Sequence, residues 1–341
     1  MLGAKGGNAP LRAKRTELIR AIEEKRGSRV IAYFTGDREN ISTRVAPDVL
    51  RVFYRHLEAL GRQDRLDIFL YTRGGDVLTP WRLINLLREY ATSIGVLVPF
   101  RAYSAGTLIC LGANEIIMGK MGELGPIDPS VANAFNPQDP ANPAARIPVS
   151  VEDVSSYIAL AQEMAGVRSE EQLAQVFRFL SEKVHPLALG NVHRNYALIR
   201  SLAKKLLRLH LAAEEEARIE SIVTNLTAKL YAHNHMISRR EAREEIGLAV
   251  AYAEEELEDL MWSLYEAYED DLKLNKPFDP AELLDEQRGP VSFEAVGGVV
   301  ESVPCLDTFV FSGTVSRLGT TPEGTPRLHV TMTGQRWVKV I

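Results

Sequence analysis

Two short segments of this chain, about 30 residues apart, combine residue types that acyl transfer requires. The first is RGGD at residues 73–76, and the second is SAG at residues 104–106. Each alone has an ordinary explanation, because paired glycines are common in turns and a serine before a helix is commonly an N-cap. Acyl transfer, however, needs a nucleophile at a sharp turn and N–H donors directed at the developing oxyanion. Together the segments predict Ser104 as the nucleophile, with the backbone N–H groups of Gly75 and Ala105 as oxyanion donors.

The apolar pattern predicts that each of these segments directly follows a buried strand. Short apolar runs predict strands at residues 29–34, 66–71, 94–100 and 115–118. Helices are predicted between them at residues 45–61, from Thr79, and from just after Ser104 to Leu111, with Thr79 as an N-cap and Pro80 at the first helical position. Strands and helices that alternate at this spacing are typical of parallel βαβ units, so the two segments can meet at one edge of the sheet.

The rest of the chain is predicted to be mainly helical up to residue 272 and to form strands near its end. We expect a flexible loop or lid at 133–148, one or two helices at 151–183, a long helix at 186–219 that can break near Gly190, an acidic helical region at 238–272, and strands at 291–341. The predicted organisation is an N-terminal arm or helix at 1–28, a main domain at 29–272 with a helical insertion at 132–182, and a linker with a small β element at 273–341.

The motif-bearing sequence resembles a known family of peptidases. The stretches LYTRGGDVLTPWRLINLL and VPFRAYSAGTLICLGANEIIMGKMGELGPIDP are similar to Clp-fold serine peptidases. The branch that they resemble is the serine dehydrogenase proteinase family, which is related to signal peptide peptidase A and to the stomatin-partner peptidases. The resemblance covers residues 29–131 and resumes at SEKVHPLALGNVHRNYALIRSLAKKLL. It implies a crotonase/Clp-like α/β fold, a serine endopeptidase that needs no ATP or other cofactor, and a homo-oligomer.

The chain departs from this family at two places that matter for catalysis. Arg73 stands where the relatives usually have proline, and it could bind a substrate carboxylate beside Gly74 or simply lie on the surface. The Clp peptidases also carry a histidine about 25 residues after the nucleophile, and this chain has none there. A Ser–Lys dyad is the alternative, because burial can lower the pKa of a lysine enough for it to act as a base. The resemblance to the stomatin-partner peptidases points to Lys183, while His185 and His193 stay open as alternative bases.

Other functions remain as alternatives at this stage. A crotonase-type acyl-CoA enzyme would use the same oxyanion geometry with Glu123 or Asp128 as its carboxylate. A non-catalytic scaffold or binding protein would keep the fold and lose turnover. His233 and His235 have the spacing of a metal chelate but no third ligand in the sequence, so we expect no metal. Walker, dinucleotide-binding and CxxC motifs are absent from the sequence.

The composition narrows the expected partners and compartment. The chain has 341 residues, a formal net charge of −5 and two cysteines, which gives no reason to expect nucleic acid or a disulfide scaffold. The longest apolar runs are far shorter than the roughly 20 residues of a membrane helix. We therefore expect a cytoplasmic protein with a peptide or protein substrate. Residues 1–28 carry seven Lys/Arg and three Glu, which leaves contact with a membrane or a membrane protein open.

Overall fold

The structure is a computed structural model that describes residues 9–127, 130–131, 133–142, 144–228, 235–284, 290–320 and 326–341. The chain divides into two compact units. The first consists of Met1–Leu124 and Ser238–Ile341, and the second of Gly125–Ile237. The predicted nucleophile Ser104 belongs to the first unit, whereas the predicted base Lys183 belongs to the second.

The first unit is built on an eight-stranded sheet with the order β10-β5-β3-β2-β1-β11-β12-β13. Five neighbouring strands are parallel: β1 (Arg29–Thr35), β2 (Gln63–Tyr71), β3 (Ala91–Val98), β5 (Glu115–Met118) and β10 (Val250–Tyr252). The strands predicted at 29–34, 66–71, 94–100 and 115–118 are therefore confirmed, as is the α/β fold class. Because β1, β2 and β3 are parallel neighbours, the segments that follow them emerge at the same edge of the sheet.

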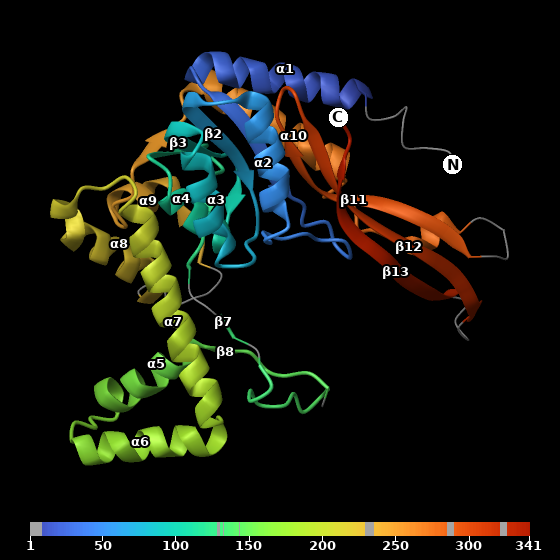
Figure 1. The fold of residues 1–341 in the computed structure, drawn as a ribbon. Coiled ribbons are helices and arrows are strands. Elements are labelled where there is room, and N and C mark those ends of the chain that lie inside the picture. Colours follow the sequence, from blue (N-terminus) through green and yellow to red (C-terminus); the bar gives the residue numbers. More distant parts are fainter. Residues whose placement is uncertain are drawn as a thin grey trace. The chain divides into compact units, whose positions relative to one another are not determined.

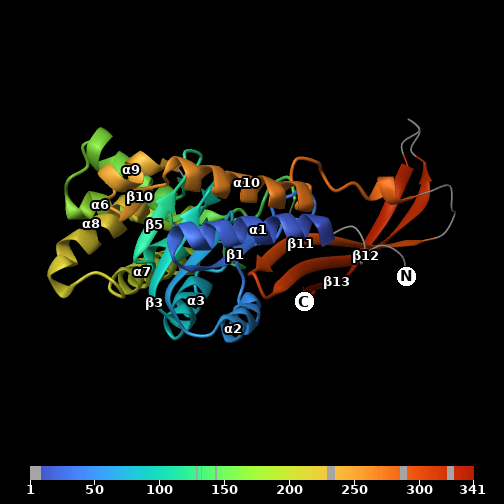
Figure 2. The ribbon, with the colours of Figure 1, turned by 90° about the horizontal axis from the view of Figure 1, so that it is seen from above.

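Helices cover both faces of this sheet, as the two views in Figures 1 and 2 show. The helices α1 (Ala9–Arg26) and α10 (Glu255–Leu272) lie side by side on one face, and α2 (Val49–Leu60) and α3 (Thr79–Arg88) lie on the other. The helix predicted at 45–61 thus begins at Val49, and Gly61 is its C-cap with a φ of +68°. Pro80 is the second residue of α3, one position later than predicted.

Aromatic side chains pack where β1 and β2 end. Phe34 and Tyr71 stack with ring centroids 4.4 Å apart, and Tyr265 and Tyr268 of α10 pack against them. All four rings are buried. Burial of such large rings removes 150–250 Å² of surface each from water and is a major contribution to core stability. The backbone at the carboxyl end of β2, directly before the glycine pair, is therefore held by a rigid core.

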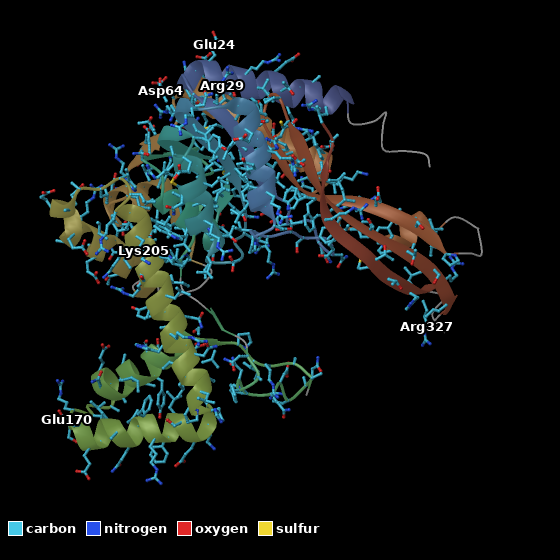
Figure 3. All side chains as sticks on the ribbon, viewed as in Figure 1. Glu24, Arg29, Asp64, Glu170, Lys205 and Arg327 are labelled. Atoms are coloured by element: carbon cyan, nitrogen blue, oxygen red, sulfur yellow. The ribbon has the colours of Figure 1, made fainter. Side chains whose placement is uncertain are left out.

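The strands expected in residues 291–341 continue the main sheet. β11 (Val291–Glu301) pairs antiparallel with β1, and β12 (Leu306–Thr320) and β13 (Pro326–Lys339) follow as a long antiparallel ribbon. Figure 3 shows Arg327 at the far end of this ribbon. The base of the ribbon is tied to the helices by Glu301, which accepts a buried hydrogen bond of 2.6 Å from Arg15 of α1.

The region predicted to be helical at 238–272 contains a strand, so that prediction was wrong in part. The helices α9 (Arg239–Glu244) and α10 are separated by β10, which pairs with β5. Gly247 interrupts the helical run with a φ of +86°. The remaining short elements are β4 (Arg101–Ala102), β6 (Glu123–Leu124), β9 (Ile237–Ser238), α4 (Ala105–Leu111) and the 3-10 helix Pro280–Leu283.

The second unit is mainly helical. Its elements are β7 (Ser130–Val131), β8 (Val149–Ser150), α5 (Val151–Ala159) with a π-helical turn at Leu160–Met164, α6 (Glu170–Lys183), α7 (Pro186–Leu207), the 3-10 helix Ala213–Glu215 and α8 (Glu216–Ala228). The long helix predicted at 186–219 runs unbroken through Gly190 and ends at Leu207, so the predicted break near Gly190 was wrong. The helix α6, which begins at Glu170 in Figure 3, has no buried residue.

Candidate active site

Ser104 lies in a sharp turn between the two-residue strand β4 and helix α4. Its backbone has a φ of +52° and a ψ of −109°, outside the left-handed helical region that non-glycine residues sometimes adopt. Among the described residues, Asn40 and Lys273 are the other non-glycine residues with positive φ. A conformation of this kind costs on the order of 1–3 kcal/mol and persists at functional sites, where it serves to present a side chain.

The hydroxyl group of Ser104 does not cap the helix that follows it. Ser104 occupies the N-cap position of α4, and its carbonyl accepts the hydrogen bond of Leu108 N–H at 3.0 Å. Its side chain, however, makes no capping hydrogen bond. Helix capping, the ordinary explanation for a serine at this position, therefore does not account for Ser104. The residue is half-buried, so its hydroxyl is near the surface.

The glycine pair lies directly against this serine. A side chain at Gly74 would place its Cβ atom 2.9 Å from Cβ and 3.3 Å from Oγ of Ser104. Gly74 and Gly75 also have φ angles of +106° and +152°, which residues with a Cβ atom rarely adopt. Only glycine therefore fits between the turn after β2 and the serine. The structure brings together the two segments that the sequence singled out.

Two backbone N–H groups lie at this junction, one in the partly exposed Gly75 and one in the buried Ala105. The N–H groups of Gly75 and Ala105 have no hydrogen-bond partner among the residues that the structure describes. The neighbouring groups are engaged: Gly74 O accepts from Val45 N–H at 2.9 Å, and Asp76 N–H donates to Val45 O at 2.8 Å. Free N–H groups beside a serine hydroxyl are the groups that an oxyanion hole requires.

Asp76 binds the first residue of the helix that follows the glycine pair. Thr79 donates both its backbone N–H and its hydroxyl to Asp76 Oδ2, each at 2.7 Å. The helix α3 begins at Thr79, and Leu78 occupies the N-cap position. The prediction that Thr79 is the N-cap was therefore wrong by one position. These two hydrogen bonds give Asp76 a structural role, because they join the end of the glycine turn to the start of α3.

Arg73 is the exposed member of a charged cluster beside the glycine pair. Its side chain is 63% exposed, and its guanidinium group lies 3.9 Å from Asp37 Oδ2. That carboxylate is largely covered, because Arg101 lies 3.6 Å away and Tyr71 donates a hydrogen bond of 2.9 Å to it. A molecule that approaches the glycine pair would therefore meet the cation of Arg73 before the carboxylate of Asp37.

Glu123, one of the two carboxylates considered for acyl-CoA chemistry, is already engaged. It accepts a hydrogen bond from the hydroxyl of Tyr103 and lies 3.8 Å from Arg101. Burial, and then this hydrogen bond, raise the pKa of Tyr103 from 10.0 to about 12. Tyr103 therefore keeps its proton at neutral pH and cannot serve as a base there. The other carboxylate, Asp128, lies outside the described residues.

The residues considered as general bases all belong to the second unit. Lys183 is the last residue of α6, and its side chain is exposed. His185 caps α7, where its Nδ1 accepts from Leu187 N–H at 3.1 Å and its ring stacks on Phe135 at 4.9 Å. His185 thus has a structural role. The pairing of any of these residues with Ser104 stays a prediction.

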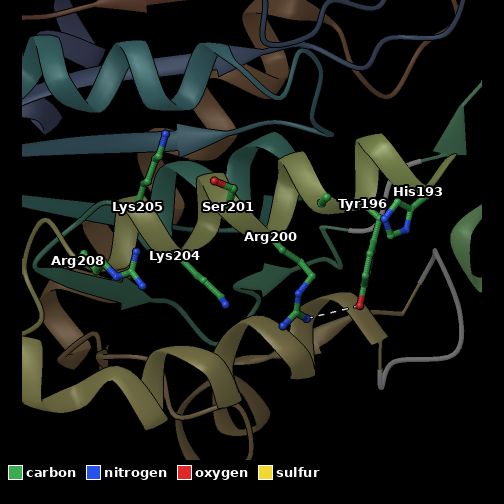
Figure 4. A pocket seen from close by; sticks show the side chains of 8 residues that line it. His193, Tyr196, Arg200, Ser201, Lys204, Lys205 and Arg208 are labelled. Atoms are coloured by element: carbon green, nitrogen blue, oxygen red, sulfur yellow. Dashed lines mark hydrogen bonds between the residues drawn. The ribbon is translucent and has the colours of Figure 1, made fainter. Parts of the chain in front are cut away.

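His193 lines an open groove along one face of α7, shown in Figure 4. The lining residues come from this helix and its C-cap Arg208: His193, Tyr196, Ala197, Arg200, Ser201, Lys204, Lys205 and Arg208. Arg200 and Lys204 both pair with Glu220 of α8, and Arg208 pairs with Glu216 at 2.6 Å. These ion pairs join α7 to α8, so the basic residues of the groove have structural partners.

A second serine forms a Ser–His–Asp array that the sequence analysis missed. His56 Nδ1 lies 2.8 Å from Ser302 Oγ, and His56 Nε2 lies 3.1 Å from Asp307 Oδ2. Ser302 and His56 are 0% exposed and Asp307 is 1% exposed. No substrate can reach this serine in the folded chain. The array has a structural role, because it joins α2 to the turn after β11 and to β12. His56 and Ser302 are 246 residues apart, and no local pattern could have linked them.

Metal and membrane sites were also considered. Within the described part of the chain, no three His, Cys, Asp or Glu side chains are grouped so that they could hold a metal ion. His235 is described, whereas His233 lies outside the described residues. Across the same described ranges, no helix is both long and apolar enough to cross a membrane. Cys110 and Cys305 are both free thiols.

The fold and the serine turn define a Clp-like α/β protein with a candidate nucleophile, and comparison with protein families agrees. Residues 7–153 match the family model of the ClpP-like SDH-type serine proteinases. This match confirms, for that part of the chain, the resemblance seen in the sequence, and it includes both the glycine pair and Ser104. It supports a serine peptidase and does not extend to Lys183.

Individual relatives add little about function. Two uncharacterized proteins of Methanocaldococcus jannaschii, MJ1495 and MJ0137, are 34% and 28% identical over 115 and 118 residues, or 31% and 32% of this chain. The chain spans only 39% and 40% of their lengths. Two solved structures of a membrane-bound stomatin-specific protease, one with a substrate peptide, align with TM-scores of 0.37 and 0.35. They are 14% and 16% identical, and the alignments cover 62% of this chain and 71% and 75% of those chains.

Proposed function

We propose that this protein is an ATP-independent serine peptidase that cleaves extended peptides with Ser104 as its nucleophile. The observation that carries the proposal is the turn at Ser104, where a positive φ presents a hydroxyl that makes no capping bond beside a glycine that leaves it room. The match of residues 7–153 to a serine proteinase family supports the same reaction class.

The proposed reaction begins when Ser104 Oγ bonds to the carbonyl carbon of the substrate while its proton passes to the neutral amine of Lys183. The oxyanion that forms accepts hydrogen bonds from the N–H groups of Gly75 and Ala105. The C–N bond then breaks, and the leaving amine takes the proton from Lys183. Water hydrolyses the acyl ester in the same way, with Lys183 again as the base.

Lys183 is the least supported part of this proposal. A lysine acts as a base when burial lowers its pKa toward neutrality, and the side chain of Lys183 is exposed in the single chain. The proposal therefore requires that the end of α6 become covered during catalysis, by the substrate or by another copy of the chain. His185 and His193 remain the alternative bases.

Self-association is part of the proposal, and the surface of the second unit supports it. Met164, Phe177 and Phe179 are exposed by 82%, 52% and 61%, and α6 buries none of its residues. Large exposed apolar side chains are a common feature of contact surfaces. We expect a homo-oligomer, which sedimentation velocity would detect as a species heavier than the 37.9 kDa chain. A purely monomeric protein at micromolar concentration would contradict this. A cytoplasmic location and a membrane-protein partner stay predictions from the sequence.

The substrate is proposed to lie as an extended strand along residues 72–76, where Gly74 leaves the backbone open and Arg73 faces the ligand. Because the carboxylate of Asp37 is covered, the exposed charge at this position is positive. We therefore expect a preference for peptides that carry an acidic residue close to the cleaved bond.

Peptide hydrolysis tests the function and this preference together. Matched peptides with Glu or Lys beside the cleaved bond would be compared on the wild type, on Arg73→Glu and on Arg327→Glu, a charge reversal at the far end of the β12–β13 ribbon. We expect Arg73→Glu to reduce kcat/KM for the acidic peptide about 10-fold or more, which corresponds to about 1.4 kcal/mol. The Arg327 variant should behave as the wild type. Absence of hydrolysis of every peptide, with micromolar binding of acyl-CoA, would instead favour the crotonase-type alternative.

A further inference from the structure

We propose that Thr72 is the positioning residue that holds the glycine turn in register with the nucleophile turn, an inference that rests on the proposed peptidase function. Thr72 follows β2 directly and is fully buried. Its N–H donates to Arg101 O at 2.8 Å, and its carbonyl accepts from Tyr103 N–H at 3.0 Å. The backbone of Thr72 is therefore hydrogen-bonded to Arg101 and Tyr103, the two residues that flank Ala102. Ser104 follows Tyr103 directly.

The hydroxyl of Thr72 selects which glycine N–H faces the substrate. Thr72 Oγ1 accepts a hydrogen bond of 3.0 Å from Gly74 N–H and another of 2.7 Å from the hydroxyl of Thr35. Gly74 N–H is thereby turned inward and occupied. The N–H of Gly75 is left as the donor without a partner in the described part of this turn. Thr35 is itself buried, so both hydroxyl groups lie in the core, where hydrogen bonds are costly to lose.

The methyl group of Thr72 contacts the other half of the site. A Cβ atom at Gly106, in the first turn of α4, would lie 2.5 Å from Thr72 Cγ2. The methyl group therefore occupies the space that Gly106 leaves open. One side chain thus bonds to the turn that carries Gly75 and packs against the helix that begins after Ser104. Valine at position 72 would keep the packing against Gly106 and lose the hydrogen bond from Gly74 N–H. Serine would keep that hydrogen bond and lose the methyl group.

This division of roles makes the proposal testable with Thr72→Val and Thr72→Ser in the full chain. The measured quantities are kcat and KM for one peptide, the rate of fluorophosphonate labelling and the melting temperature. We expect Thr72→Val to lower kcat and the labelling rate about 10- to 100-fold with KM changed less than about 2-fold, because a donor used in the transition state is misplaced. Thr72→Ser keeps the hydroxyl, and we expect it to stay within about 3- to 5-fold of the wild-type kcat.

Two further variants separate this role from general destabilisation. Thr35→Val removes the donor to Thr72 Oγ1 and should lower kcat by a smaller factor, which keeps the test available where Thr72→Val does not fold. Thr227→Val removes a buried hydroxyl of α8 that bonds to Val223 O and Arg200, and it should lower the melting temperature without lowering kcat.

The outcomes distinguish this inference from the proposed function. An active wild type with equal kcat for Thr72→Val and Thr72→Ser overturns the role of Thr72 alone. Equal losses in Thr72→Val and Thr227→Val would also overturn it, because they would reflect stability only. A wild type that neither cleaves peptide nor reacts with the probe overturns the proposed function, and the inference falls with it.

Discussion

The two serines with chemical potential in this protein, Ser104 and Ser302, differ in almost every respect. Ser302 has the residue types of a catalytic triad but uses the imidazole the other way round, because His56 Nδ1 lies 2.8 Å from Ser302 Oγ and His56 Nε2 lies 3.1 Å from Asp307 Oδ2. Ser104 has a strained backbone and partial exposure, and the N–H groups of Gly75 and Ala105 beside it have no partner in the part of the chain that the structure describes. Ser302 has hydrogen-bonded His and Asp neighbours but no exposure, whereas Ser104 is partly exposed beside the proposed oxyanion donors and its base is only predicted.

The difference teaches that triad atoms alone do not identify an active site. A buried hydroxyl needs hydrogen-bond partners in any case, because an unsatisfied polar group in the core is costly. A histidine and an aspartate can supply these partners without any catalytic role. Lys273 has a positive φ because it is the left-handed C-cap of α10, whereas Ser104, with a ψ of −109°, lies outside that region, so its conformation is the better marker of function.

The largest expected effect separates the two serines directly. Ser104→Ala should reduce peptide hydrolysis by at least about 10³-fold, because no other group can form the acyl ester. Ser302→Ala, measured in the same assay, should keep the wild-type rate within about 3-fold. If Ser302→Ala loses activity and Ser104→Ala keeps it, the comparison is reversed.

The next effect concerns the base that Ser104 lacks in the described site. Lys183→Met should lower kcat by about 10²- to 10⁴-fold, the range expected when a general base is removed. His185→Ala and His193→Ala serve as matched variants and should stay within about 3-fold. A loss confined to one of the histidine variants would move the role of base to that residue.

A smaller effect tests the structural role of the second array. Ser302→Ala removes the hydrogen-bond partner of His56 Nδ1, and we expect it to lower the free energy of unfolding by about 1–3 kcal/mol. Urea denaturation measures this change. Ser104→Ala should be neutral or stabilising in the same experiment, because alanine loses no capping bond there. Equal destabilisation by both variants would remove the contrast between the two serines.

The fold was predictable from the sequence because its signals are local. Apolar runs indicated the four central parallel strands, and the predicted helix at 45–61 contains α2. The predicted break near Gly190 was wrong because a single glycine within a helix costs only about 1 kcal/mol, which packing easily offsets. The strand β10 was missed because its three residues are defined by pairing with β5.

The candidate site was predictable only in part, because some of its contacts join residues that are far apart in the sequence. Residues 73–76 and Ser104 each follow a strand, so their meeting at one edge of the sheet could be inferred. The role of Thr72 depends on contacts with Thr35 and Gly106 that no sequence spacing reveals. The array at Ser302 depends on pairing across 246 residues. Long-range contacts of this kind leave no periodic signal in a single sequence.

The smallest expected effect is the pH dependence of Tyr103, the residue before Ser104. Its pKa is raised to about 12 by burial and by the hydrogen bond to Glu123, so the folded state holds this proton more tightly than the unfolded state. The unfolded state releases the proton near pH 10, and the folded state therefore loses stability as the pH rises from 10 to about 12. Denaturation at these pH values should show a smaller loss for Tyr103→Phe than for the wild type.

The same variant also tests whether Tyr103 takes part in proton transfer. Tyr103→Phe should leave the pH dependence of kcat between about pH 6 and pH 9 unchanged, because the tyrosine is protonated throughout that range. A shifted profile would show that Tyr103 takes part in proton transfer to or from Ser104.

The most direct test of the account is to treat the folded wild-type protein with a fluorophosphonate probe and map the adduct by mass spectrometry. The reagent phosphonylates an activated, accessible serine, which is the property that distinguishes Ser104 from the buried Ser302. We expect one adduct, on Ser104, that is absent from Ser104→Ala and unchanged in Ser302→Ala. An adduct on Ser302, or equal labelling of the wild type and Ser104→Ala, would contradict the assignment of Ser104 as the nucleophile.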